Sequence, residues 1–156
     1  LAIDPTLQTA IAGRTEALAA RAAQYREDLD SVSQALQRTP TDSGLLNQRC
    51  WIRVVNDDDL DAALADCNAA ILSEPRNAAA LDSRGLVHLK RGDYAASIAD
   101  YDAALAVDPA RGHYLFGRGA ARIRMGLVNE GQADIAEAER IEPGVTASYL
   151  SYGVAL

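Results

Sequence analysis

Residues 92–109, GDYAASIADYDAALAVDP, decide the fold of this chain. Four apolar side chains recur every three or four residues, which is the spacing of one face of an α-helix: Tyr94, Ile98, Tyr101 and Leu105. Gly92 breaks the helical pattern before them, and Asp93 is a good N-cap residue. Pro109 ends the pattern, because proline disfavours helical geometry in the residue before it. The stretch therefore predicts a helix over about residues 94–107.

The same pattern returns along the chain with a period of 34 residues. Pro75, Pro109 and Pro143 keep this step, and an alanine stands five positions before each of them. Other slots keep the step as well: Gly85 and Gly119; Leu81 and Leu115; and Ala63, Ser97 and Gly131. One helix pair cannot bury its apolar face alone, so copies are expected to stack. We expect units at 44–77, 78–111 and 112–145.

This repeat resembles the tetratricopeptide repeat family. The resemblance rests on the run LDSRGLVHLKRGDYAASIADYDAALAVDP, in which seven residues carry it: Leu81, Gly85, Tyr94, Ser97, Tyr101, Ala104 and Pro109. It covers residues 44–145 and implies an all-α, right-handed α-solenoid of helix-turn-helix repeats. In this family the first helix of each unit lines a concave wall. The first unit departs from the pattern, because Trp51 stands where the others have glycine and is expected to push its two helices apart or to force a small shift.

Both ends of the chain are expected to be helical. Residues 25–40 repeat the apolar pattern, so residues 1–43 predict a degenerate N-terminal unit. Either a helix pair or one long helix from about Thr6 to Gln37 fits this unit, and we favour two helices. Residues 146–156 predict a short C-terminal capping helix packed on residues 128–141. The alternative is that this apolar segment fills the groove of a second copy and forms a homodimer.

The resemblance implies a non-catalytic scaffold or adaptor that binds a protein partner, as a peptide or a helix, on the concave wall. The wall residues expected to contact the partner are Gln48, Ile52, Val55, Leu86, Leu89, Lys90, Phe116, Ala120, Ile123 and Arg124. Contiguous apolar surface of this kind marks interaction sites. Two alternatives remain open: the N-terminal segment or tight curvature covers the wall, or the chain is a self-associating structural module.

Composition argues against other classes of function. A net charge of -7 disfavours binding to nucleic acid and to anionic membranes. No apolar run is long enough for a membrane span. His88 and His113 lie in different units without a nucleophile or carboxylate partner nearby in the sequence, and we expect no catalytic site, metal or cofactor. Arg118, Arg122 and Arg124 form a basic patch that either meets an acidic partner or pairs with Glu130 or Asp134.

Cys50 and Cys67 are the only cysteines. They lie at similar distances from the break between the two helices of their unit, so they are expected to face each other. They are either buried thiols or a disulfide, which persists in oxidising compartments. A disulfide would predict an exported or periplasmic protein, and free thiols a cytoplasmic one. The chain begins at Leu1 and not at methionine, so we expect that a signal peptidase or the choice of expressed fragment removed preceding residues.

Overall fold

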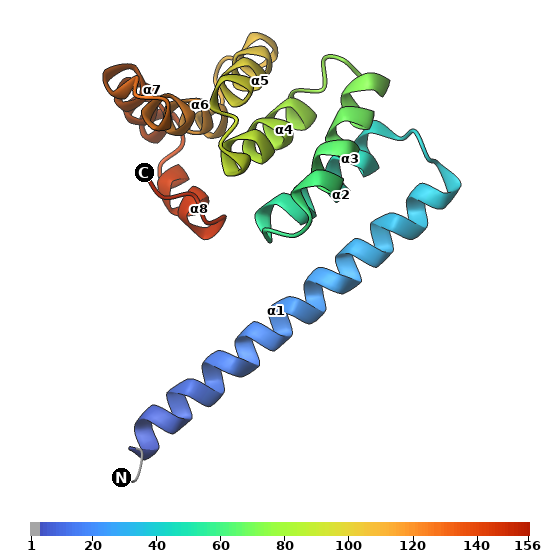
Figure 1. Cartoon of the computed structure of the whole chain (residues 1–156), viewed down its shortest axis with the longest axis vertical. Helices are drawn as coiled ribbons and strands as arrows, with labels where there is room; N and C mark the ends of the chain where they lie inside the picture. The colour runs from blue at the N-terminus through green and yellow to red at the C-terminus, as the bar shows by residue number, and fades with distance from the viewer. Residues whose placement is uncertain (1–3) are drawn as a thin grey trace.

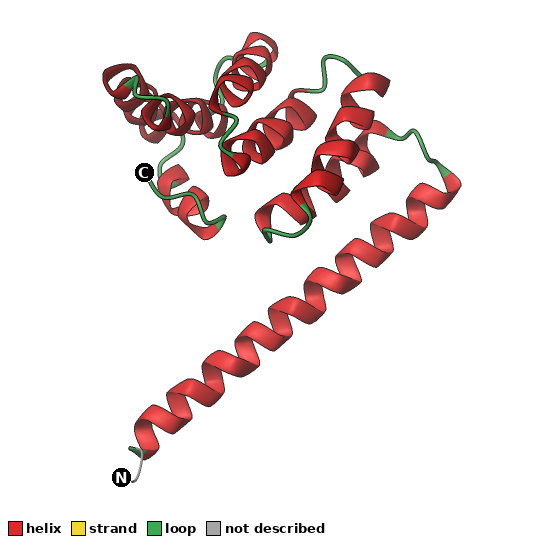
Figure 2. Ribbon diagram, in the orientation of Figure 1, coloured by secondary structure: helices red, strands yellow, loops and turns green. Residues whose placement is uncertain are grey.

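Helices account for the regular structure of residues 4–156, the part of the chain that the computed structural model describes (Figures 1 and 2). Eight helices and no strand form within these residues. In chain order they are α1 (Pro5–Arg38), α2 (Ser43–Val55), α3 (Leu60–Ser73), α4 (Ala78–Arg91), α5 (Tyr94–Val107), α6 (Gly112–Arg124), α7 (Val128–Ile141) and α8 (Val145–Ser151). The predicted all-α solenoid is confirmed.

The middle six helices form three stacked pairs. Helices α2 and α3, α4 and α5, and α6 and α7 pack as hairpins, and α3 and α5 each contact the first helix of the next pair. Figure 1 shows the pairs following one another along a curved array, with α8 on its inner side. Buried apolar side chains from all three pairs join in one core, among them Cys50, Val54, Leu86, Phe116 and Ala121.

Side-chain caps fix where several helices begin. The carboxylate of Asp42 accepts a hydrogen bond from the backbone N–H of Leu45, and the amide oxygen of Asn77 does the same for Ala80. Such caps satisfy backbone donors that have no partner inside the helix. Asp93 occupies the predicted N-cap position of α5 but makes no capping bond. Its carboxylate lies 3.4 Å from the guanidinium of Arg91 instead.

The predicted register of α2 is wrong by one residue. The N-cap residues Asp42 and Asn77 are 35 positions apart, whereas the starts of α3 and α5 are 34 apart. The turn between α2 and α3 holds the extra residue, and there Asp57 and Asp59 adopt left-handed backbone angles. Cys50 therefore takes the slot of Gly85 at the helix crossing. Trp51 lies on the inner wall, so it does not push α2 and α3 apart.

The two cysteines form a disulfide between α2 and α3. Their sulfurs are bonded, and their Cα atoms are 5.5 Å apart. In the second pair, the ring of Tyr101 packs against Gly85 at the corresponding place. Cys50 and Cys67 thus replace a glycine–tyrosine contact with a covalent link.

The expectation of two N-terminal helices is also wrong. α1 is a single helix from Pro5 to Arg38, because its alanine-rich sequence has no proline after Pro5 and its one glycine, Gly13, lowers the helix propensity without interrupting the helix. Its C-terminal part packs Val32 and Leu36 against Leu46 of α2 and so acts as the second helix of a preceding unit. The N-terminal half stands clear of the array (Figure 1). None of the described helices, α1 included, is long and apolar enough to cross a bilayer.

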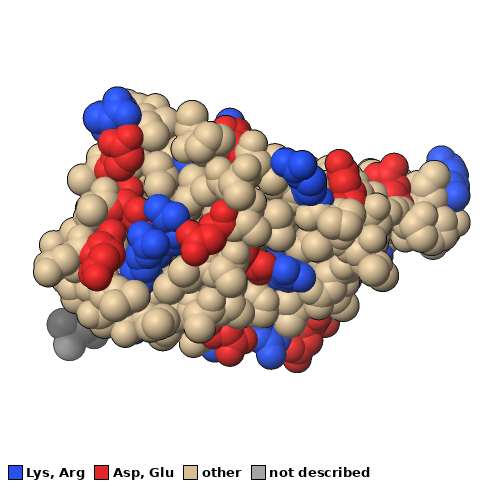
Figure 3. All heavy atoms as spheres, turned by 90° about the horizontal axis from the view of Figure 1, so that it is seen from above, with Lys and Arg blue, Asp and Glu red and all other residues tan. Residues whose placement is uncertain are grey.

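An arginine–aspartate pair ties each hairpin together. Arg49 pairs with Asp66, Arg84 with Asp100 and Arg118 with Asp134, and in each pair the Nε–carboxylate distance is 2.8–2.9 Å. The aspartates keep the 34-residue step and are buried. Arg122 also donates to Asp134 at 2.6 Å, so most of the basic patch on α6 is paired within the chain. Figure 3 shows basic and acidic side chains side by side on this face of the molecule.

The third hairpin depends on two facing glycines. A Cβ atom added at Gly131 would lie 2.6 Å from the carbonyl oxygen of Gly119. We expect Gly131→Ala to lower the free energy of unfolding by about 1–3 kcal/mol, since neither backbone can move away without losing packing. Gly13→Ala is the matched control, because Gly13 has no neighbour within 4 Å; it should leave the stability unchanged or raise it by up to about 1 kcal/mol. Urea unfolding measures the stability of both variants. Equal changes in the two would contradict the close approach of the α6 and α7 backbones at Gly119 and Gly131.

Candidate interaction surface

The C-terminal segment, residues 145–156, lies on the concave wall formed by α2, α4 and α6. Its buried apolar residues Val145, Tyr149 and Val154 join the same core as Leu86 and Phe116. α8 contacts both α6 and α7. The segment also reaches further than a cap on α7 would, because Tyr152 packs edge-on against Trp51 of α2 with the ring centroids 5.2 Å apart.

Tyr149 anchors the segment. The centroid of its ring lies 4.5 Å from the ring centroid of Phe116 and 4.6 Å from that of His113. No part of Tyr149 is exposed. Its hydroxyl donates to the backbone oxygen of His113 at 2.9 Å and lies 3.2 Å from the hydroxyl of Tyr101. The ring of Tyr101 occupies the space that a side chain at Gly117 would need. The wall therefore contains a slot shaped for one aromatic side chain.

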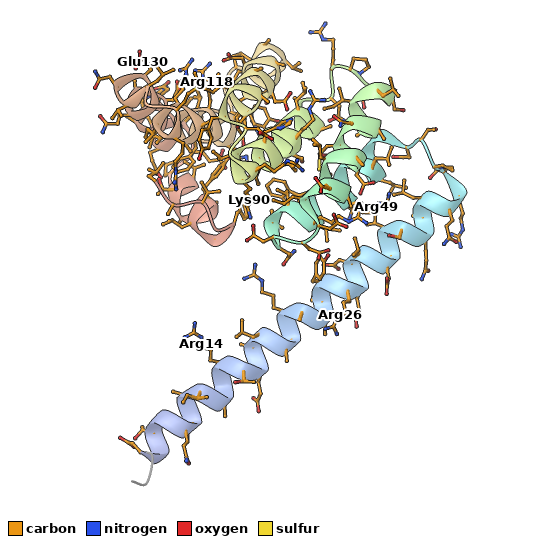
Figure 4. All side chains as sticks on the ribbon, in the orientation of Figure 1. Arg14, Arg26, Arg49, Lys90, Arg118 and Glu130 are labelled. Atoms are coloured by element: carbon orange, nitrogen blue, oxygen red, sulfur yellow. A yellow bond between two sulfur atoms is a disulfide. The ribbon has the colours of Figure 1, made fainter. Side chains whose placement is uncertain are left out.

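Polar contacts hold the end of the segment. Arg124 donates to the backbone oxygen of Ala155 at 2.7 Å. Lys90, labelled in Figure 4, forms an ion pair with Asp57 at 2.6 Å, and both side chains lie beside Gly153. The segment is thus fixed to α4, to α6 and to the turn after α2.

The predicted wall residues are divided between the core and the surface. Four are buried: Leu86, Leu89, Phe116 and Ala120. Four are half-buried: Ile52, Val55, Lys90 and Ile123. Gln48 and Arg124 are exposed. Ile52 packs with the cluster between α1, α2 and α3, because the register of α2 differs by one residue. The apolar stripe on α4 and α6 is covered by the C-terminal segment and not by the N-terminal one.

Sequence reasoning misses the aromatic contacts of this surface. The repeat pattern puts Trp51 at the helix crossing, and it gives Tyr149 and Tyr152 no role beyond a cap. A signal exists for Tyr149, which falls in the slot of the buried Leu115 when the 34-residue period is continued. No comparable signal places Tyr152 against Trp51, since that contact joins the two ends of the array.

His113 links α6 to α4 electrostatically. Its Nδ1 lies 3.2 Å from Oδ1 of the buried carboxylate of Asp82. Burial acts to lower the pKa of His113, but the hydrogen bond and charge of Asp82, together with the charge of Glu142, outweigh it. The pKa is therefore raised above its usual value of 6.5.

Stability should consequently depend on the charge of His113. A raised folded-state pKa means that the stabilisation is complete below about pH 6.5 and is lost as the pH rises through the folded-state value. We expect the wild-type chain to lose stability relative to His113→Asn as the pH rises from about 6.5, the ordinary pKa of histidine, through the raised folded-state value. Urea unfolding across this range measures the difference. If the stability of wild type relative to His113→Asn instead increases with rising pH, the assigned interaction with Asp82 is contradicted.

A second concavity, of about 520 Å³, lies where α1 passes the array. Leu18 and Tyr25 of α1 face Val55 and Leu150 across it. The hydroxyl of Tyr25 donates to Asp58, and burial together with this bond raises the pKa of Tyr25 to about 12. Within residues 4–156 no cluster of three His, Cys, Asp or Glu side chains could hold a metal ion.

Comparisons with known proteins identify the repeat. Residues 78–111 match the family described as tetratricopeptide repeat. The chain is similar to a MamA protein of solved structure, with a TM-score of 0.69, 15% identity and coverage of 98% of this chain and 83% of that one. A thermophilic TPR protein of Thermus thermophilus gives a TM-score of 0.69 at 20% identity, covering 86% and 76% of the two chains.

The first TPR domain of the human RPAP3 protein is similar as well. Its TM-score is 0.62 at 18% identity, and the likeness covers 73% of this chain and 91% of that one. Identities at this level establish the shared fold. No curated protein matches the sequence.

Proposed function

We propose that this chain is a tetratricopeptide repeat protein and acts as a non-catalytic scaffold or adaptor that binds a peptide or short helix of a partner protein on its concave wall. The repeat fold supports a role in protein–protein interaction in general. The observation that carries the specific proposal is the C-terminal segment seated on that wall. The wall already holds a short helix through one aromatic anchor, Tyr149, which is how a groove recognises a helical partner.

The seated segment also sets the condition for binding. Because the segment belongs to the same chain, its effective concentration at the wall is in the millimolar range typical of short tethers. A partner must therefore displace the segment or bind beside it. The four predicted wall residues that are buried become available to a partner only when the segment leaves.

Capture and elution test this function. Wild-type protein and Tyr149→Ala are immobilised and exposed to an extract of the source organism. We expect Tyr149→Ala to capture a partner more efficiently than wild type, and a free peptide of residues 144–156 to elute it. The same peptide with alanine at position 149 is the matched control and should not elute it. Capture that neither peptide affects would refute binding at the wall.

The alternative function is self-association through the same contact. Gly144 has a left-handed backbone angle and follows Pro143, and together they form the connection at which the segment could cross to a second copy. Domain exchange of this kind reuses contacts already present in one chain. A dimer that appears in sedimentation experiments and disappears in Tyr149→Ala would favour this alternative over the adaptor.

We also propose that the protein works in an oxidising compartment, after export from the cytoplasm. The disulfide between Cys50 and Cys67 supports this, because reducing compartments keep such pairs open. Cells are quenched in acid, which stops thiol exchange, and the extract is then alkylated at neutral pH. The extent of alkylation reports the redox state of the two cysteines. A chain that is fully alkylated without prior reduction would refute the proposal.

A further inference from the structure

The uncovered part of the concave wall contains a small polar pocket. Its volume is about 210 Å³, and it adjoins the C-terminal segment through Trp51 and His113. α2 supplies Asn47 and Trp51, α4 supplies Ala79, Asp82 and Ser83, and the start of α6 supplies Arg111 and His113. The first helices of all three repeats thus meet here, and the C-terminal segment does not fill the space.

Hydrogen-bond acceptors dominate the interior. The side-chain oxygen of Asn47 is buried and has no hydrogen-bond partner among the described residues. The carboxylate of Asp82 is buried and receives a hydrogen bond from His113 at Oδ1. Its other oxygen, Oδ2, accepts no hydrogen bond within residues 4–156. The hydroxyl proton of Ser83 is donated to the backbone oxygen of Ala79, which leaves the hydroxyl oxygen to accept.

The two basic residues of the pocket are already engaged. His113 uses its Nδ1 on Asp82 and stacks on Tyr149. Arg111 stands at the rim, where its guanidinium carbon lies 5.8 Å above the ring of Tyr114 and its Nε lies 3.8 Å from Asp108. His113 is thus engaged with one oxygen of Asp82, and Arg111 with Tyr114 and Asp108, which leaves Oδ2 of Asp82 and the side-chain oxygen of Asn47 without a donor from these two residues.

We infer that this pocket binds the guanidinium or ammonium group of an arginine or lysine side chain from the partner. The free oxygens of Asp82 and Asn47 would accept its hydrogen bonds, and the ring of Trp51 forms a wall that attracts a cation. Arginine should bind more tightly than lysine, because its planar group can both stack on an indole and bond a carboxylate with two N–H groups.

The size and the charge of the site support this class of ligand. Pockets for whole small molecules start at about 300 Å³, so a volume of 210 Å³ suits one long side chain. A chain with a net charge of -7 also attracts cations over longer distances. The inference rests on the proposed function only in taking a protein as the source of the cation.

Trp51 offers a direct readout, since it is the only tryptophan in the chain and lines the pocket. Its indole N–H signal is followed by NMR in the full chain while blocked alanine pentapeptides with one central test residue are added. We expect the arginine peptide to shift this signal with a dissociation constant of about 1 mM. The citrulline peptide, which has the same shape without the charge, should bind at least tenfold more weakly, and the glutamate peptide should not bind.

Two variants localise the effect. Asp82→Asn should weaken binding of the arginine peptide at least tenfold. Glu130→Gln, on the exposed surface of α7 (Figure 4), should leave it unchanged. If Asp82→Asn does not fold, the contrast between arginine and citrulline in the native chain still decides the question.

Each remaining outcome overturns the inference or part of it. Equal binding of arginine and citrulline peptides, preferential binding of glutamate, or no shift at all would refute a cation site. Free agmatine that binds at least tenfold more tightly than the arginine peptide would refute a protein partner as the source, because it would show that the pocket prefers a small free cation to a side chain on a backbone. If the pocket passes these tests but the chain captures no partner, the proposed adaptor function is refuted and the cation site still stands.

Discussion

Replacing Tyr149 with alanine is expected to lower the free energy of unfolding by about 3–5 kcal/mol. The side chain is fully buried, and its hydroxyl bonds the backbone oxygen of His113. The substitution leaves a cavity beside Phe116 and removes the partner of a buried oxygen. Urea unfolding gives the change in free energy, and limited proteolysis shows whether the C-terminal segment comes loose.

The neighbouring Leu150 provides the control, because 56% of its surface is exposed. Leu150→Ala lies in the same helix and should change the stability by no more than about 0.5 kcal/mol. Similar losses for the two variants would mean that helix formation in α8, and not the aromatic slot, holds the segment on the wall.

Removal of the disulfide should have an effect of similar size. Cys50 and Cys67 are 17 positions apart, and a cross-link over a loop of this length stabilises the folded state by about 3 kcal/mol. We expect Cys50→Ala/Cys67→Ala to unfold at a temperature about 10 °C lower than wild type. Differential scanning calorimetry with and without a reductant measures this.

The reductant separates the bond from the packing of the two side chains. Wild type in reductant should unfold near the temperature of the double variant, and the double variant should not respond to reductant. A reductant-insensitive wild type would show that the link contributes nothing, whatever the variant does. The expected loss is large because α2 and α3 otherwise meet without the glycine–tyrosine contact that Gly85 and Tyr101 make in the second pair.

The sequence predicts the repeats well because their residues act locally. Each 34-residue unit contains its own apolar spacing, its own break and its own proline, so α3 to α7 follow from these features without long-range information. The arginine–aspartate pairs are encoded in the same way, since Asp66, Asp100 and Asp134 also keep the step. Of the three, the sequence analysis offers only a pairing of the α6 arginines with Asp134, and that as one alternative, because apolar spacing treats charged residues as solvated surface.

The errors arise where one local pattern allows two structures. An extra residue can be placed before α2 or after it, and only the caps at Asp42 and Asn77 place it after. Residues 6–37 carry continuous helical propensity, which fits one helix or two until tertiary packing is known. The position of the C-terminal segment depends on contacts between residues about 100 positions apart, such as Tyr152 with Trp51, and no periodic signal encodes those.

The arginine–aspartate pairs bear on how far the array can bend. Arg84 donates to Asp100 in its own hairpin and also, at 2.9 Å, to Asn68 in the one before. Arg118 likewise bridges to Asp102 of the preceding hairpin at 2.7 Å. Opening or tightening the curve would stretch these bonds at every junction. The array should therefore be rigid and keep its curvature without a bound partner. Most of the conformational entropy lost on binding would then be lost by the partner and not by the array.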